Sequence, residues 1–241
     1  MAMARQYPRV GCTQPLGPAV EGATGAHGEP NGSMCLGGYV GLISRQPLRI
    51  IRCMQGKRNQ VRIIGGRWRG RKVSFPDVAG LRPTSDRVRE TVFNWLQPVI
   101  AGARCLDLFA GSGAFGFEAA SRGASRVLMI DRDARVAAGL NQLCVRLDAT
   151  EIEVRCQDAL TFLDGKPEPF DILFLDPPFR SGLLSPVVGR ILDGGWLAPM
   201  GRVYVESDDE NTLRGLDRRL RVERLKRAGN VWFGLLSDVQ E

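Results

Sequence analysis

The sequence Asp176-Pro177-Pro178-Phe179 combines groups that could bind a flat ring carrying an amine. It follows the apolar segment FDILFL, residues 170–175, which is typical of a buried strand. The adjacent prolines fix the backbone and provide no amide donors, so the carbonyl group of Pro177 is free to accept a hydrogen bond. An exocyclic amine is conjugated with its ring and is a poor nucleophile. Hydrogen bonds from its N–H groups to Asp176 and Pro177 would favour a more pyramidal nitrogen, while Phe179 would stack on the ring.

Residues 106–116, LDLFAGSGAFG, form a second candidate site, a glycine-rich loop between a buried strand and a helix. Glycine permits a tight turn and close approach of a ligand to the backbone, as several adenosine-bearing cofactors require. Asp131 ends the next strand, 20 residues after Gly111, where an acidic side chain would bind ribose hydroxyls. Asp107 distinguishes between the possible cofactors, because a carboxylate at that position repels a pyrophosphate but attracts the sulfonium and ammonium groups of S-adenosylmethionine.

The predicted cofactor is therefore S-adenosylmethionine rather than a nicotinamide or flavin dinucleotide. The alternative for Asp107 is a local cap in a structural turn. Asp158 follows the third strand, where it could accept a hydrogen bond from the adenine amino group; a helix N-cap is an equally good and compatible explanation. The predicted cofactor-binding residues are Asp107, Phe109, Ala110, Gly111, Ser112, Gly113, Asp131 and Asp158.

Both motifs resemble those of S-adenosylmethionine-dependent methyltransferases. The stretch 107–113 resembles the first motif of the class I enzymes, and residues 176–179 resemble the [DN]-P-P-[YF] motif of enzymes that methylate exocyclic amino groups. In such enzymes positioning supplies much of the rate, and the target base must be unpaired or flipped out. The predicted catalytic residues are Asp176, Pro177 and Phe179, and a plain turn after the strand is the alternative.

Strands and helices alternate from residue 103 onward, which is typical of α/β proteins. The alternation predicts a mostly parallel sheet with helices on both faces, and the resemblance implies a Rossmann-like class I methyltransferase fold with seven strands. Ligands of such sheets bind beyond the carboxyl ends of the strands. Strands are expected at 104–110, 126–131, 151–156, 170–175 and 202–207, with two more between 221 and 236.

A β-hairpin is expected in front of this domain. Segment 61–75, VRIIGGRWRGRKVSF, predicts two short strands around Gly65-Gly66. Its interleaved cations and tryptophan suit phosphate contact and base stacking, although an edge strand protected by charge is the alternative. The predicted RNA-binding residues of this hairpin are Arg67, Trp68, Arg69, Arg71 and Lys72.

Segment 81–100, LRPTSDRVRETVFNWLQPVI, predicts a helix capped by Thr84 or Ser85. Its start is expected to pack near the cofactor pocket. Arg87 and Arg89 are added to the predicted RNA-binding residues, and ordinary capping with surface charge is the alternative.

Composition limits the remaining possibilities. A formal net charge of +7 favours a polyanionic partner. The six cysteines form no C-x-x-C pair and the only histidine, His27, lies far from any cysteine cluster, so neither a metal site nor histidine catalysis is expected. No apolar run approaches the roughly 20 residues that span a bilayer, and no signal sequence is recognisable. We expect a cytoplasmic, monomeric protein without a membrane partner.

Four blocks together closely resemble the RsmD family of ribosomal RNA guanine-N2 methyltransferases. They are residues 61–73, 81–96, 106–124 and 176–184, and the resemblance extends from about Val61 to the C-terminus. It implies S-adenosylmethionine as methyl donor, the N2 amine of a guanine in 16S rRNA as acceptor, and the small ribosomal subunit or its assembly intermediate as the particle that carries it. Asp131 stands where the family is expected to have glutamate, a change that keeps the carboxylate.

Residues 1–58 have no counterpart in that resemblance. They are rich in glycine and proline and are expected to be a disordered leader. A flexible basic arm and a true start at Met54 are the alternatives. The expected organisation is a leader at 1–58, a hairpin and helix at 59–101, and a catalytic domain at 102–241.

Three other functions are considered. A DNA amino-methyltransferase could also use the motif at 176–179, but no long insertion is present for reading a duplex. A noncatalytic RNA-binding or assembly protein would not need Asp107, Asp131 and Asp176 together. A dehydrogenase would explain neither Asp107 nor the motif at 176–179.

Overall fold

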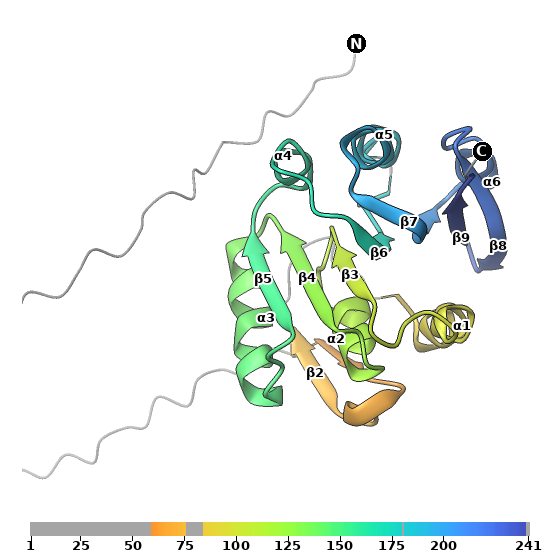
Figure 1. Cartoon of the computed structure of the whole chain (residues 1–241). Helices are drawn as coiled ribbons and strands as arrows, with labels where there is room; N and C mark the ends of the chain where they lie inside the picture. The colour runs from red at the N-terminus through yellow and green to blue at the C-terminus, as the bar shows by residue number, and fades with distance from the viewer. Residues whose placement is uncertain (1–58, 76–83, 180, 240–241) are drawn as a thin grey trace, which may run out of the picture. The chain divides into compact units, whose positions relative to one another are not determined.

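The computed structural model describes residues 59–75, 84–179 and 181–239, so the predicted leader lies outside the described residues. Seven strands form one sheet in the order β5-β4-β3-β6-β7-β9-β8, and β1 and β2 form a separate hairpin (Figure 1). The strands are β1 (Asn59–Arg62), β2 (Lys72–Phe75), β3 (Arg104–Asp107), β4 (Arg126–Asp131), β5 (Ile152–Cys156), β6 (Phe170–Leu175), β7 (Leu197–Ser207), β8 (Leu220–Ala228) and β9 (Val231–Asp238). The helices are α1 (Asp86–Leu96), α2 (Ala114–Ser121), α3 (Ala134–Leu147), α4 (Ala159–Leu163), α5 (Leu184–Gly194) and α6 (Glu210–Arg214).

The order of the strands confirms the predicted Rossmann-like α/β fold. Strands β3 to β7 are parallel to one another, and β9 is antiparallel to both β7 and β8. From β3 the chain builds outward through β4 and β5, and then returns to place β6 and β7 on the other side of β3. This reversal occurs between β3 and β6, and their carboxyl ends therefore form the topological switch point where ligands of such sheets bind.

Helices cover both faces of the sheet. Alternate residues of a strand face opposite sides, so Cys105 and Phe174 pack with α1, α2 and α3, whereas Leu106 and Leu175 pack with α4, α5 and α6. Figure 1 shows α4 and α5 grouped on one side of the sheet. Burial on both faces explains why the central strands are continuous apolar segments in the sequence.

Helix α1 is shorter than the predicted segment 81–100. It begins after Ser85, whose hydroxyl accepts a hydrogen bond from the amide of Val88 at 3.4 Å. It ends at Leu96, shortly before Pro98, because proline lacks the amide donor needed to continue the helical hydrogen bonds. Residues 81–83 lie outside the described residues.

Two features of the C-terminal half were not expected from the sequence. Strand β7 begins at Leu197 rather than at Arg202. Helix α6 follows it and is capped by Asp209, which accepts hydrogen bonds from the amides of Asn211 and Thr212. A helix of five residues has too little periodicity to be recognised in a sequence.

The β1–β2 hairpin is anchored to α2 by buried polar contacts. Glu118, fully buried on α2, accepts hydrogen bonds from the amides of Ile64 at 2.7 Å and Gly65 at 2.8 Å. A Cβ atom on Gly66 would lie 1.8 Å from the carbonyl oxygen of Ser121, so the close approach requires glycine. The expected tight turn at Gly65-Gly66 is therefore replaced by a longer connection that contains the 3₁₀ turn Gly66–Trp68.

The structure corrects the prediction that Trp68 stacks on RNA. Its side chain is 5% exposed and packs edge-on against Phe117 of α2, with 6.4 Å between ring centroids. The amide of Trp68 also donates to the hydroxyl of Ser121 at 3.0 Å. Trp68 therefore belongs to the hydrophobic core beneath the hairpin.

The prediction that Arg89 contacts RNA is also wrong, because its side chain is fully buried. Its Nη2 donates to the carbonyl oxygen of Arg62 at 2.8 Å and to Asp86 at 2.7 Å, and its Nη1 lies 3.8 Å from Glu118. A buried guanidinium needs such partners to offset its desolvation. Arg89 therefore links α1 to the hairpin and to α2.

No helix in the described part of the chain is long and apolar enough to cross a membrane.

Replacing Glu118 with alanine is expected to destabilise the fold by about 3–5 kcal/mol, since the substitution leaves Arg89 and two backbone amides without their buried partner. Urea unfolding followed by circular dichroism would measure the loss. Glu90→Ala, on the exposed side of α1, is the control and should change the free energy of unfolding by less than about 0.5 kcal/mol. Equal effects of the two substitutions would show that Glu118 does not anchor the hairpin.

Candidate active site at the carboxyl edge of the sheet

Three acidic side chains meet at the switch point. Asp107 is the last residue of β3, Asp176 follows β6, and Glu206 lies near the end of β7. Asp107 pairs with Phe174 and Leu175 pairs with Val205, so the register brings the ends of these three neighbouring strands together. Buried apolar strands therefore hold these three acids at the carboxyl edge of the sheet.

Asp107 is a buried carboxyl group at the base of the glycine loop. It is 3% exposed, and its Oδ2 accepts a hydrogen bond from the amide of Gly116 at 3.2 Å. Burial and, to a lesser extent, the negative charge of Asp131 raise the pKa of Asp107 to about 7, against the lowering effect of hydrogen bonds from the amides of Gly116 and Phe109. A carboxyl group in this state gains from a nearby cation.

The glycine loop has the backbone that its sequence predicted. Gly111 and Gly113 have φ angles of 49° and 73°, in the left-handed region that favours glycine. A Cβ atom on Gly113 would lie 2.6 Å from Leu140 and 2.7 Å from the ring of Phe117. The loop therefore turns sharply against α2 and α3, and the buried Ser112 lies within it.

Asp131 connects this loop to the next strand. Its Oδ2 accepts a hydrogen bond from the amide of Gly111 at 2.9 Å, and its Oδ1 accepts one from the amide of Asp133 at 2.8 Å. Burial raises the pKa of Asp131. The carbonyl oxygen of Asp131 accepts a hydrogen bond from the amide of Gln157 at 2.9 Å, which brings the neighbouring Asp158 to the same edge.

Asp158 has the local role that was considered for it. It caps α4 by accepting hydrogen bonds from the amides of Leu160 at 3.0 Å and Thr161 at 3.1 Å. The side chain of Asp158 is exposed, and its contact with an adenine remains a prediction.

The motif at 176–179 presents one acid and one aromatic ring at this edge. Asp176 is half-buried, and Pro177 is buried behind it. The ring of Phe179 is 47% exposed, which is unusual for a phenylalanine and leaves its face available for stacking. Burial, together with the charges of Glu206 and Asp107, raises the pKa of Asp176 well above its usual range.

The structure adds three residues that sequence analysis did not assign to the site. The hydroxyl of Thr84, just before α1, lies 3.4 Å from Asp176 and 2.9 Å from Glu206. The hydroxyl of Tyr204 donates to Glu206 at 2.6 Å. Polar residues at alternate positions of a buried strand were the available signal for Tyr204 and Glu206, because they share one face of β7.

Most of the predicted RNA-binding cations lie away from this site. Arg67 forms an ion pair with Glu151, which precedes β5 and therefore marks the amino edge of the sheet. Arg69, Arg71 and Lys72 are exposed near the same tip of the hairpin. Arg87 differs, since it is exposed in the first turn of α1, three residues after Thr84.

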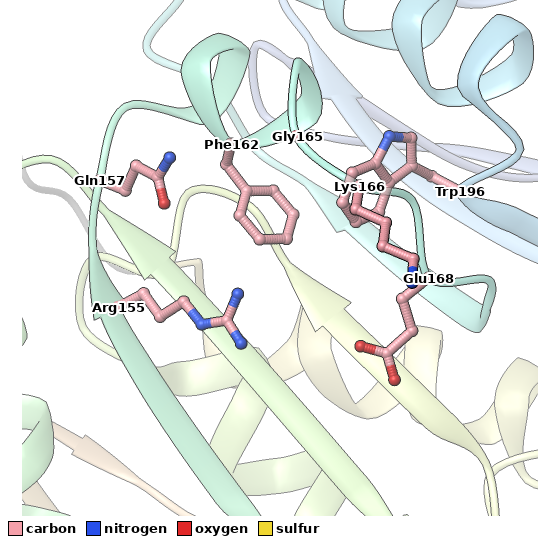
Figure 2. Close-up of a pocket in the computed structure, with 7 residues that line it drawn as sticks. All are labelled: Arg155, Gln157, Phe162, Gly165, Lys166, Glu168 and Trp196. Carbon is pink, nitrogen blue, oxygen red and sulfur yellow. The ribbon is translucent and has the colours of Figure 1, made fainter.

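A cavity of about 230 Å³ lies near α4 and shares no residue with the acidic cluster. Figure 2 shows that the ring of Phe162 lies at its centre, with Arg155 below and Trp196 opposite. Its other lining residues are Gln157, Gly165, Lys166 and Glu168. In the described ranges, no group of histidine, cysteine, aspartate or glutamate side chains has an arrangement that could hold a metal ion.

Comparison with known proteins agrees with this geometry. Residues 61–236 match the family model described as conserved hypothetical protein 95. The chain is 49% identical over 176 residues to ribosomal RNA small subunit methyltransferase D of Escherichia coli K12, covering 73% of this chain and 89% of that protein. The protein of the same name from Haemophilus influenzae is 44% identical over 161 residues, covering 65% and 83% of the two chains.

Solved structures show the same relation. A putative methyltransferase from Escherichia coli has 48% identity and a TM-score of 0.70, covering 75% of this chain and 98% of its own. A putative methylase from Haemophilus influenzae has 37% identity and a TM-score of 0.63, covering 76% and 100%. The glycine loop, the acids at the ends of β3 and β6, and these matches lead to one conclusion: the chain belongs to the ribosomal RNA small subunit methyltransferase D family.

Proposed function

We propose that this protein transfers a methyl group from S-adenosylmethionine to the exocyclic N2 amine of a guanine in the RNA of the small ribosomal subunit. The observation that carries the proposal is the meeting of the glycine loop and Asp107 with Asp176 and Phe179 at one edge of the sheet. The names of the relatives support a small-subunit RNA as the substrate. The resemblance of the four sequence blocks supports the guanine N2 amine.

The residues present fit this cofactor. Asp107 is a buried carboxyl group whose charge the described residues leave without an ion-pair partner, which suits the cationic end of the molecule. Gly111 and Gly113 leave room for a ligand to approach the backbone, and Asp131 is held where it can bind ribose hydroxyls. When bound, S-adenosylmethionine supplies an electrophilic methyl group on its sulfonium.

Asp176 and Phe179 would hold the acceptor. The carboxylate of Asp176 and the carbonyl oxygen of Pro177 accept hydrogen bonds from the amine, which orients its lone pair, and the exposed ring of Phe179 stacks on the base. An N–H proton must leave the nitrogen as the new N–C bond forms, and Asp176 is the nearest acceptor in this arrangement. Because Asp176 is half-buried and Pro177 is buried at the sheet edge, the guanine must be unpaired or flipped out to reach them.

The test of this function is transfer of a tritiated methyl group to small-subunit particles from a strain that lacks the gene, with free rRNA and DNA in parallel. We expect N2-methylguanosine, identified by digestion and mass spectrometry. Asp176→Ala should abolish the transfer while calorimetry still detects cofactor binding. Labelled N6-methyladenine or N4-methylcytosine would replace the proposed substrate, and cofactor binding without any transfer would favour a noncatalytic RNA-binding role.

Affinity for S-adenosylmethionine is expected to depend on pH through Asp107. The pKa of this group is about 7 in the free protein, and a cation binds the ionised form better. The affinity should therefore reach its maximum above about pH 7 and fall by up to about tenfold per pH unit below it. Calorimetry in buffers of different ionisation enthalpy would detect the released proton. Asp107→Asn should weaken binding and remove this pH dependence; an unchanged dependence would assign it to another group.

We propose that the tip of the β8–β9 hairpin contacts RNA beside the three acids Asp107, Asp176 and Glu206. Ser207 pairs with Trp232 and Trp232 with Arg227, so both residues lie at the carboxyl edge of the sheet, close to Glu206. The guanidinium of Arg227 lies 5.6 Å from the centroid of the Trp232 ring. A cation stacked on an aromatic ring suits a single-stranded nucleic acid.

Charge reversal at two ends of the same strand would test this contact. Arg227→Glu is expected to raise the KM for the particle about tenfold without changing cofactor affinity, because it places a negative charge against phosphate. Arg221→Glu is the matched control, since Arg221 is exposed at the amino edge, opposite Ser237. Arg69→Glu applies the same charge reversal at the tip of the β1–β2 hairpin, and the KM of that variant for the particle is measured in parallel. Equal effects of Arg227→Glu and Arg221→Glu would exclude a local contact.

A further inference from the structure

The hydroxyl of Thr84 lies between the side chains of two acids from neighbouring strands. Its oxygen is 3.4 Å from Oδ2 of Asp176 and 2.9 Å from Oε1 of Glu206. A hydroxyl group has one proton to donate. Thr84 can therefore donate to only one carboxylate at a time, and both contacts are satisfied together only when one of the acids carries a proton.

Glu206 is held from two sides. Its Oε1 accepts a hydrogen bond from the hydroxyl of Tyr204 at 2.6 Å in addition to the one from Thr84. Glu206 is 6% exposed and Tyr204 is fully buried, so water competes little for these contacts. An ionisable side chain with this degree of burial and two hydroxyl donors has a fixed position relative to Asp176.

The groups that act on Asp176 come from three elements. Glu206 and Tyr204 face it from β7, Asp107 faces it from β3, and Thr84 faces it from the start of α1. Among the described residues that act on Asp176, none is basic. Three carboxyl groups this close cannot all remain ionised without a large electrostatic cost.

We propose that Thr84 and Glu206 are positioning residues for methyl transfer: Thr84 holds Oδ2 of Asp176 so that Oδ1 faces the substrate amine, and Glu206 controls whether Asp176 carries a proton. The inference rests on the proposed function, because it assigns a task to Asp176 in amine methylation. It adds a proton-sharing chain that runs from Asp176 through Thr84 to Glu206 and ends at Tyr204.

The two neighbours act on Asp176 in opposite directions. The charge of Glu206 raises the pKa of Asp176, whereas the hydrogen bond from Thr84 lowers it. Asp176 must be ionised to accept the proton of the amine, so activity is present above its pKa and is lost as the pH falls through it. Removing Glu206 should therefore extend activity to lower pH. The hydrogen bond from Thr84 also lowers the pKa of Glu206, so the direct effect of this hydroxyl on Asp176 is measured after Glu206 has been replaced by glutamine. In that background, removing the hydroxyl of Thr84 should restrict activity to higher pH.

The experiment is the pH profile of kcat for methylation of small-subunit particles by the full-length protein. In the Glu206→Gln background, Thr84→Val should move the acidic limb upward by about one pH unit and lower kcat near neutral pH about tenfold, since a hydrogen bond to a charged group is lost. Thr84→Ser keeps the hydroxyl, so the shift of the acidic limb and the loss of kcat should both be small in that variant. Glu206→Gln should move the limb downward. The KM for the particle should change little in each variant.

A second readout separates this inference from the proposed function. The titration of Asp176 can be followed without substrate by NMR of protein labelled with ¹³C in the aspartate carboxyl groups, with Asp176→Asn to assign the signal. Glu206→Gln should shift the titration of Asp176 downward, and adding Thr84→Val to that variant should shift it upward again, whether or not the particle is methylated. Shifts in the same direction, or no shift, would overturn the inference even if the wild-type enzyme methylates guanine.

Tyr204→Phe provides another variant in case Glu206→Gln does not fold. The hydrogen bond from Tyr204 lowers the pKa of Glu206, so its loss should leave Glu206 more often protonated and should lower the pKa of Asp176. The acidic limb should then move in the same direction as in Glu206→Gln, but by less. Calorimetric binding of S-adenosylmethionine, unchanged in all these variants, would show that the site remains intact.

Discussion

The accumulation of buried acid at the carboxyl edge of the sheet is the constraint on which the rest of the site depends. Asp107 and Glu206 are almost fully buried and Asp176 is half-buried, yet all three belong to adjacent parallel strands. A site built only for stability would not place three carboxyl groups together, with no basic partner among the residues that the structure describes, because their mutual repulsion and desolvation both oppose folding. The energetic cost is consistent with a site that binds a cationic ligand and accepts a proton.

The N-terminal extension contributes to the same edge through a chain of buried contacts. Glu118 of α2 holds the hairpin backbone, and Arg89 connects that region to α1. The start of α1 then carries Thr84 to Asp176 and Glu206. The segment that the sequence predicts to be a basic, RNA-binding arm is thus partly an internal support, and its buried contacts help to hold Thr84 beside Asp176.

The arrangement also divides the basic surface into two regions. The tip of the β1–β2 hairpin lies at the amino edge with Glu151, whereas Arg227 and Trp232 lie at the carboxyl edge. The second region lies beside the end of β7 that carries Glu206, whereas the first lies at the opposite edge of the sheet.

The sequence by itself determined the fold class, the glycine loop with Asp107 and Asp131, and the motif from Asp176 to Phe179. These features depend on local patterns, namely continuous apolar strands and glycines at positions of positive φ, which operate within a few residues of the chain. Only the tertiary structure decided that Arg89 and Trp68 are buried and that Thr84, Tyr204 and Glu206 surround Asp176. Those outcomes depend on contacts such as Thr84 with Glu206, 122 residues apart in the chain. The sequence around an arginine looks the same whether the side chain lies on the surface or beneath a hairpin. The environment of Arg89 is set by the strand order and by the buried carboxylate of Glu118, and a local sequence pattern specifies neither of them.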